Sequence, residues 1–281
     1  MDNCKEKELK IAACKVRIGI INAIYHAKSG HPGGSLSSAD ILTYLYFAEM
    51  NINPLNPAMP ERDRFVLSKG HCAPGLYSVL ALKGYFNKDE LLKLRQIGAM
   101  LQGHPDMNGT PGIDMSTGSL GQGVSAACGM AKAAKIDGNS FRVYTLLGDG
   151  ECEEGQVWEA AMFAAFNKLD NLCVIVDNNG LQIDGKVSEI VGPEPLDTKF
   201  EAFGFNVIKV NGHSFNELFN AFNKAKTVKN KPTVIIAKTV KGNGVSFMED
   251  KVSWHGTAPN EEQYNIAINE LTAMLSELEG K

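Results

Sequence analysis

Residues 141–150 read FRVYTLLGDG, and residues 172–181 read LCVIVDNNGL. Each stretch begins as an apolar run typical of a buried strand and ends in a turn of Gly, Asp or Asn. Residues 153–168, between the two, have the pattern of a helix. Strand, helix and strand in this order predict two parallel strands whose carboxyl ends meet at one edge of a sheet, where α/β proteins bind ligands.

The rest of the chain extends this alternation. We expect further strands at 64–67, 206–210 and 233–239, and helices at 9–28, 197–203, 214–227 and 261–278. Ser37 and Asp40 have the spacing of a capping box, which predicts a second helix running toward Met50. With no internal repeat or linker, the sequence predicts an α/β fold with one parallel sheet flanked by helices, in a single domain over residues 1–281.

The composition limits the class of protein. The 281 residues are 44% hydrophobic and 21% charged, with a net charge of −4, as in ordinary folded proteins. No apolar run is long enough to cross a membrane, and residues 1–6 lack the core of a signal peptide. The sequence has no basic stripe, which argues against a nucleic-acid partner. The six scattered cysteines, without C-x-x-C, predict a cytoplasmic protein that has neither disulfides nor a zinc site.

The turn Gly148-Asp149-Gly150 can bring backbone N–H groups close to a phosphate. One interpretation is a dinucleotide site, in which Asp177 would bind a ribose. Glu153, however, stands where the third glycine of that motif belongs. In addition, the Asp149 carboxylate would repel a diphosphate unless a cation lay between them.

The end of the following strand can complete such a cation site. The Asp149 carboxylate, the Asn179 amide oxygen and the Leu181 carbonyl would form the incomplete oxygen shell that Mg²⁺ prefers. Gly180 can supply the turn that directs the Leu181 carbonyl inward. Two ordinary tight turns are the alternative interpretation.

Gly148-Asp149-Gly150 followed by Asn178-Asn179 resembles the thiamine-diphosphate motif. Five further segments resemble transketolases: SGHPGG at 29–34, LSKGH at 67–71, GHP at 103–105, TGSLGQG at 117–123 and EDKVSWHG at 249–256. The resemblance spans most of the chain. It implies the thiamine-diphosphate-binding fold and an enzyme that transfers a two-carbon ketol unit from a ketose or ketose phosphate to an aldose or aldose phosphate.

The resemblance also implies roles for particular residues. His31, His104 and His255 would be catalytic, contacting the sugar hydroxyls and carbonyl. The metal, Mg²⁺ or another divalent cation such as Ca²⁺ or Mn²⁺, would be bound by Asp149, Asn179 and Leu181. The residues implied to bind thiamine diphosphate are His71, Gly118, Ser119, Leu120, Gly148, Asp149, Gly150, Glu154 and Asn179. Independently, four of the six histidines lie beside Gly or Pro in expected loops, whereas His26 and His213 are interpreted as structural or surface residues.

Transketolases carry a second domain that supplies the glutamate activating the aminopyrimidine ring and the arginines that bind sugar phosphate. The present chain is less than half the family's usual length and ends in a polar segment at 277–281. We therefore expect the N-terminal subunit of a split transketolase, active with a C-terminal partner subunit in an α₂β₂ assembly. Glu154 and Glu159 match family residues at the interface between protomers, although both could be solvated charges in the first turns of a helix.

Three other functions remain open. The α subunit of a 2-oxo acid dehydrogenase shares the GDG and Asn-Asn motifs, but is not expected to carry SGHPG or Trp254-His255-Gly256. A 1-deoxyxylulose-5-phosphate synthase normally has a continuous chain and different histidine segments. A domain that binds thiamine diphosphate or a dinucleotide for regulation would not need the four histidine segments.

Overall fold

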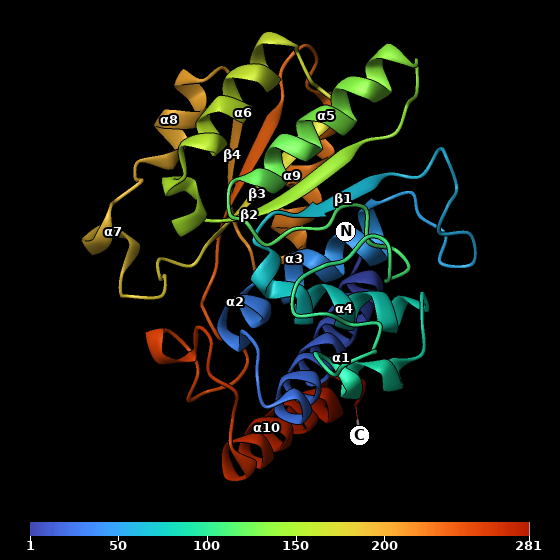
Figure 1. Cartoon of the computed structure of the whole chain (residues 1–281), viewed down its shortest axis with the longest axis vertical. Coiled ribbons are helices and arrows are strands. Elements are labelled where there is room, and N and C mark those ends of the chain that lie inside the picture. Colours follow the sequence, from blue (N-terminus) through green and yellow to red (C-terminus); the bar gives the residue numbers. More distant parts are fainter. Residues whose placement is uncertain (281) are drawn as a thin grey trace.

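The computed structural model describes residues 1–280 and forms a five-stranded, all-parallel sheet within them (Figure 1). The strand order is β1-β2-β3-β5-β4. The strands are β1 Arg64–Leu67, β2 Val143–Gly148, β3 Leu172–Asn178, β4 Asn206–Asn211 and β5 Thr233–Lys238. Gly148 of β2 pairs with Asp177 of β3, so these strands end side by side. The predicted parallel sheet is confirmed.

Helices cover both faces of the sheet. On one face α5, α6 and α8 pack on inward-facing side chains such as Val174 and Val234. On the other face α1, α3, α4 and α9 share one hydrophobic core with Ile175 and Ile235, and α10 lies along α1 at the bottom of Figure 1. The α-helices are α1 Asn3–Ala27, α2 Pro32–Ser37, α3 Ala39–Tyr44, α4 Ala73–Lys83, α5 Gln122–Ile136, α6 Gly155–Phe166, α7 Val187–Ile190, α8 Leu196–Ala202, α9 Phe215–Thr227 and α10 Glu261–Glu279.

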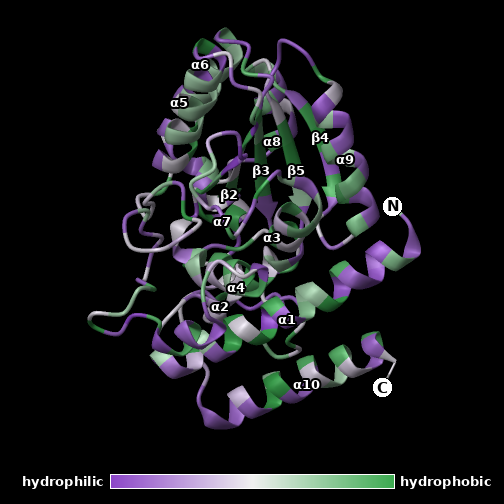
Figure 2. Ribbon diagram, turned by 90° about the vertical axis from the view of Figure 1, so that its right-hand side faces the viewer, coloured by the Kyte–Doolittle hydropathy of each residue, from purple (hydrophilic) through white to green (hydrophobic). Residues whose placement is uncertain are grey.

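The hydropathy pattern matches this layering. Figure 2 shows hydrophobic strands in the interior and more hydrophilic outer helix faces. Short turns of 3₁₀ helix at Gly70–Cys72, Lys88–Lys93, Gly150–Glu153 and Val252–Trp254, and a π-helical turn at Leu45–Glu49, complete the helical segments of residues 1–280. In that part of the chain, no helix has the length and apolar character needed to span a bilayer.

The predicted capping box at Ser37 and Asp40 is wrong. Helix α2 ends at Ser37, and α3 begins at Ala39 with no side-chain cap. The Ser37 hydroxyl instead donates to Asp177 over 2.6 Å, and the Asp40 carboxylate pairs with Arg17. Both polar groups are buried, and buried partners from distant segments satisfy them better than the local backbone would.

The long helix α5 was not predicted. Its sequence, QGVSAACGMAKAAKI, is rich in Ala and Gly and lacks a stripe of large apolar residues. Small side chains allow the helix to lie close to the sheet and to α6, with Ala127 and Ala131 fully buried. Tertiary packing, rather than a strong local pattern, therefore accounts for this helix.

Candidate active site

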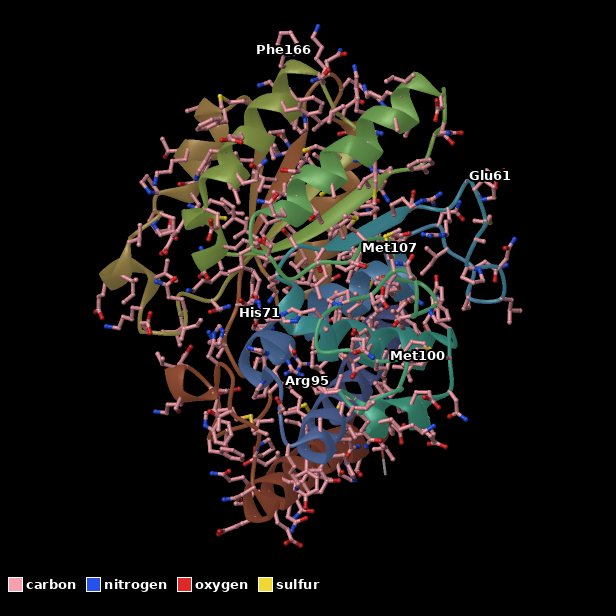
Figure 3. All side chains as sticks on the ribbon, viewed as in Figure 1. Glu61, His71, Arg95, Met100, Met107 and Phe166 are labelled. Atoms are coloured by element: carbon pink, nitrogen blue, oxygen red, sulfur yellow. The ribbon has the colours of Figure 1, made fainter. Side chains whose placement is uncertain are left out.

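A cavity of about 410 Å³ lies at the carboxyl edge of the sheet. Segments from both halves of the chain converge on it. The predicted site residues that line it are His31, His71, Gly118, Leu120, Gly148, Asp149, Gly150, Asn179, Leu181 and His255. Figure 3 labels His71 in the region between the sheet and helix α2. The edge predicted to bind a ligand is therefore hollow, and most of the predicted residues face the hollow.

Asp149 is buried in the turn that follows β2. Its carboxylate accepts hydrogen bonds from the backbone N–H of Gly150, at 2.9 Å, and of Gly180. Burial raises the pKa of this carboxyl group to about 6. Within residues 1–280 no lysine or arginine forms an ion pair with it. A methyl group on Gly150 would lie only 2.7 Å from the Gln182 Oε1 atom, so glycine permits this close approach.

Asp177, at the end of β3, is buried in a complete network. It accepts hydrogen bonds from the Lys69 ammonium, the Ser37 and Thr239 hydroxyls and, at 3.2 Å, the Asn179 Nδ2 atom. Burial alone would raise the pKa of Asp177, but the Lys69 charge and the hydrogen bonds from Lys69, Ser37 and Thr239 together lower it. Because its side chain is fully buried and paired, Asp177 is not free to bind a ribose, which removes the main support for a dinucleotide site.

These groups fit a diphosphate bound through a divalent cation. The Asp149 carboxylate, the Asn179 amide oxygen and the Leu181 carbonyl are hard oxygen donors of the kind Mg²⁺ takes. Asp177 holds the Asn179 amide nitrogen and thereby orients its oxygen, which accepts from the Leu181 N–H at 3.1 Å. Lys241 adds positive charge on the same wall, because its Nζ atom donates to the Leu181 carbonyl oxygen at 2.9 Å.

Three of the four predicted histidines form a cluster beside this wall. The ring centroids are 5.2 Å apart for His31 and His71, 5.5 Å for His31 and His255, and 5.3 Å for His71 and His255. Burial, followed by nearby positive charges, lowers the pKa of His31 to about 4 and of His255 to about 3, and lowers that of His71 well below its usual value. The three imidazoles are therefore neutral at pH 7. The buried His31 Nδ1 atom has no hydrogen-bond partner within residues 1–280 and is available to a ligand.

The glycine-rich loop at 117–123 lies against the GDG turn. The buried Glu151 joins the two, accepting hydrogen bonds from the Ser68 hydroxyl, the Gly121 N–H at 2.9 Å and the Gly148 N–H at 3.1 Å. Gly118 has a φ of +156°, and a methyl group there would lie 3.2 Å from the His104 ring. Glu151 thus holds together the two backbone segments predicted to contact the cofactor.

Three predicted site residues lie outside the cavity wall. His104 lies next to Gly118 and part of its surface is exposed. Partial burial of the ring, followed by the Arg95 charge, lowers its pKa. Ser119 is exposed and lines a smaller neighbouring hollow of about 220 Å³ with Met115 and Gln122. Glu154, like Glu159, is exposed on the helix that follows the GDG turn.

Two buried lysines in this site were not predicted. Lys69 and Lys241 both line the cavity and are only 2% exposed. Lys69 immediately precedes Gly70-His71, one of the segments quoted for the resemblance, so its position was a usable signal. Lys241 lies in the run Thr239-Val-Lys-Gly-Asn-Gly244, which follows the last strand and leads to the same sheet edge.

Known proteins are similar in sequence to this chain over most of its length. A sequence profile of the family described as transketolase, thiamine diphosphate binding domain, matches residues 9–272. The 6-deoxy-6-sulfo-D-fructose transketolase subunit SqwG of Clostridium sp. (strain MSTE9) is 51% identical over 86% of this chain and 88% of its own. An apulose-4-phosphate transketolase subunit from Phocaeicola vulgatus is 41% identical over 96% of each chain.

Longer proteins match over part of their length. Human transketolase is 48% identical over 91% of this chain, but the matched part is 40% of the human protein. The crystal structure of transketolase from Campylobacter jejuni superimposes with a TM-score of 0.87 at 35% identity, covering 96% of this chain and 45% of that one.

Proposed function

The chain belongs to the transketolase thiamine-diphosphate-binding family, and on that premise we propose that it is the N-terminal subunit of a split transketolase. In this proposal residues 1–281 form one diphosphate-binding domain, and the pyrimidine-binding and C-terminal domains belong to another chain. The relatives that match over nearly their whole length are named as transketolase subunits, which supports a division of the enzyme between two chains.

One observation carries the proposal: the oxygen donors around Asp149 and the cluster of neutral histidines face the same cavity. We propose that Asp149, Asn179 and the Leu181 carbonyl hold Mg²⁺ or a similar divalent cation, and that the cation binds the diphosphate. The Gly150 N–H and His71 would contact the diphosphate as well. Lys241, on the same wall, adds favourable charge for this anion, whereas the charge of Lys69 is balanced by Asp177.

The sugar chemistry is assigned to the histidines. Thiamine diphosphate, when bound, supplies the carbanion that attacks the ketose carbonyl carbon. His31 and His255, neutral at pH 7, can donate a hydrogen bond to the carbonyl oxygen and accept a proton from the neighbouring hydroxyl as the C2–C3 bond breaks. His104, at the rim beside Gly118, would bind a sugar hydroxyl. The backbone of Gly118, Ser119 and Leu120 would contact the aminopyrimidine.

A partner subunit completes the proposed site. It would supply the glutamate that activates the aminopyrimidine, and the natural assembly is α₂β₂. The helix that follows the GDG turn supports an interface there. Besides Glu154 and Glu159, it exposes the apolar side chains of Met162, Phe163 and Phe166, the last labelled at the top of Figure 3.

The proposed substrates are anionic sugars. The two subunit-length relatives are named for 6-deoxy-6-sulfo-D-fructose and apulose 4-phosphate, sugars that carry a sulfonate and a phosphate. We therefore propose a ketose with such an anionic group as donor and an aldose phosphate as acceptor. The six free thiols support a location in the cytoplasm, where cysteines stay reduced.

A ketol-transfer assay with thiamine diphosphate and Mg²⁺ tests the proposal. The chain is assayed alone and then with the product of a neighbouring gene that encodes the missing half. No transfer alone and transfer by the pair is the expected result. Transfer by the chain alone would disprove the division of the active site, and oxidation of a 2-oxo acid by the pair would indicate a dehydrogenase instead.

A further inference from the structure

Three ionisable side chains that the proposed chemistry does not use meet beneath the loop that carries Lys241. Arg17 of α1 and Asp40 of α3 are each 5% exposed and form a two-pronged ion pair, with N–O distances of 3.0 and 2.6 Å. The His213 Nδ1 atom, in the turn after β4, lies 2.7 Å from the Asp40 Oδ2 atom. A buried carboxylate is thus shared between a guanidinium and an imidazole.

The partners of His213 determine which ring nitrogen carries the proton. The Val240 backbone N–H can only donate, and it lies 2.9 Å from the His213 Nε2 atom. Burial alone would raise the pKa of Asp40, but the Arg17 charge and the hydrogen bonds from His213 and Arg17 together lower it, so the carboxylate can only accept. The Asn243 Nδ2 atom lies 3.2 Å from the Nδ1 atom, and the amide presents its oxygen there when it is turned over. The neutral ring with a proton on Nδ1 satisfies the contacts with Asp40 and Val240, and it satisfies the contact with Asn243 once that amide is turned over.

Val240 immediately precedes Lys241, so the contact with His213 acts on the backbone of that lysine. The same loop is held at two other points: the Arg17 Nε atom donates to the Asn243 carbonyl at 3.0 Å, and the Gly242 N–H donates to the Gly33 carbonyl at 3.0 Å. At the far end of its side chain, Lys241 Nζ lies 2.9 Å from both the Leu181 carbonyl oxygen and the His255 Nδ1 atom.

We propose that His213 is a positioning residue: its Nδ1–H form, selected by Asp40, holds the Val240 backbone and thereby places the Lys241 ammonium against the diphosphate wall of the cavity. This inference rests on the proposed function of that cavity. It also gives a role to a histidine that lies outside the four histidine segments and that the sequence indicated only as a structural or surface residue. The ring acts only by holding the Val240 backbone in place, and this role requires no proton transfer.

Two substitutions separate the two contacts of the ring. In His213→Asn the amide lies at the height of Nδ1, so it can still donate to Asp40 but cannot accept from Val240. In His213→Gln the amide oxygen reaches the position of Nε2 and can accept from Val240. Each variant loses the imidazole, so the two form a matched pair for thermal stability.

Thiamine diphosphate with Mg²⁺ is the probe. Its binding to the full chain assembled with the partner subunit is measured by calorimetry, and the melting temperature is measured on the same preparation. We expect His213→Asn to weaken the binding of thiamine diphosphate on the order of 10-fold and His213→Gln to weaken it by less than about 3-fold. The melting temperatures of the two variants should be similar. Equal losses of affinity in the two variants would overturn the proposal and leave a purely structural histidine. If the unaltered chain, assembled with its partner subunit, does not bind thiamine diphosphate at all, the proposed function fails instead.

A double-mutant cycle tests whether Lys241 carries the effect. In a Lys241→Met background, His213→Asn should weaken binding no further, because the ammonium that it misplaces is absent. Full additivity of the two losses would contradict the proposal.

The protonation of the ring is a readout independent of binding and of every variant. Long-range ¹H–¹⁵N spectra of the histidine-labelled chain at neutral pH should show a protonated Nδ1 and an unprotonated Nε2 at His213. The reverse arrangement would remove the acceptor for Val240 and would overturn the proposal even if no variant folds.

Discussion

Asp149 and Asp177 stand at the ends of neighbouring strands, and both are buried, yet the chain treats them in opposite ways. Asp177 is paired with Lys69 and accepts from two hydroxyls and an amide, which lowers its pKa. Asp149 receives two backbone N–H groups, and burial raises its pKa to about 6.

The difference separates a structural carboxylate from a binding one. A buried charge is stable when a cation lies beside it, and for Asp177 the protein supplies that cation. For Asp149, the chemistry of the site favours a cation that arrives with the ligand. The comparison predicts that substitutions around Asp177 act mainly on folding, whereas substitutions around Asp149 act mainly on cofactor binding.

The largest effect is expected at Lys69. Lys69→Met leaves the Asp177 carboxylate buried without its cation, and removal of one partner of such a pair typically costs about 3–5 kcal/mol. Urea unfolding followed by circular dichroism should show this loss as a lower midpoint with an unchanged slope.

Lys241→Met is the matched control. Lys241 is equally buried, but burial lowers its pKa, and it makes no ion pair within residues 1–280. Its replacement should change the free energy of unfolding by no more than about 1 kcal/mol. Similar losses for the two lysines would mean that Asp177 does not need its cation and would break the comparison.

The second prediction is the reverse pattern at Asp149. Asp149→Asn removes the charge that a divalent cation requires, so affinity for thiamine diphosphate with Mg²⁺ should fall by about 10- to 100-fold. The same change should lower the free energy of unfolding by only about 1–3 kcal/mol, because the amide keeps one acceptor oxygen and leaves one of the Gly150 and Gly180 N–H groups without an acceptor. Titration calorimetry and urea unfolding of one preparation measure both quantities. A large loss of stability with unchanged affinity would assign Asp149 to the fold.

The third prediction extends the comparison to imidazoles. In the folded chain the pKa of His255 is lowered to about 3, against 6.5 for a free side chain, so the unfolded chain takes up a proton first as the pH falls. Its contribution to stability is complete above pH 6.5 and is lost progressively toward the lower value. His255→Asn should therefore recover roughly 1 kcal/mol at about pH 5, allowing for partial exposure, and little at pH 7. Urea midpoints at both pH values check this, and an equal effect at each would exclude titration as the cause.

Local patterns predicted the strands and the site edge well. The apolar runs ending at Leu147 and Asp177 are strands, and the turns after them meet at one cavity, because parallel pairing forces their carboxyl ends together. The Gly and Asn residues of those turns carry information about backbone shape that can be read without knowing the neighbours.

Long-range partners could not be predicted in the same way. The Lys69 ammonium meets a carboxylate 108 residues away, and the Ser37 hydroxyl meets the same carboxylate across 140 residues. Ser37 has the sequence spacing of a helix cap, but its hydroxyl donates to a buried carboxylate in the core. His213 likewise depends on Asp40, which lies 173 residues earlier in the chain. Only the packed fold determines which polar groups lose water and must find each other.

The smallest effect on folding is expected at Glu154, and it sharpens the comparison within a single turn. Glu151 is buried and accepts hydrogen bonds from two backbone segments. Glu154, three residues later, is exposed, and its β-carbon lies next to Gly121. Glu154→Ala should change the free energy of unfolding by about 0.5 kcal/mol or less, as for an ordinary surface residue. If Glu154 lies at the interface with the partner subunit, the partner concentration that gives half-maximal ketol transfer should rise at least about fivefold. An unchanged requirement for the partner would show that Glu154 contributes nothing to assembly, and Phe163 and Phe166, which helix α6 also exposes, would then be the side chains to replace next.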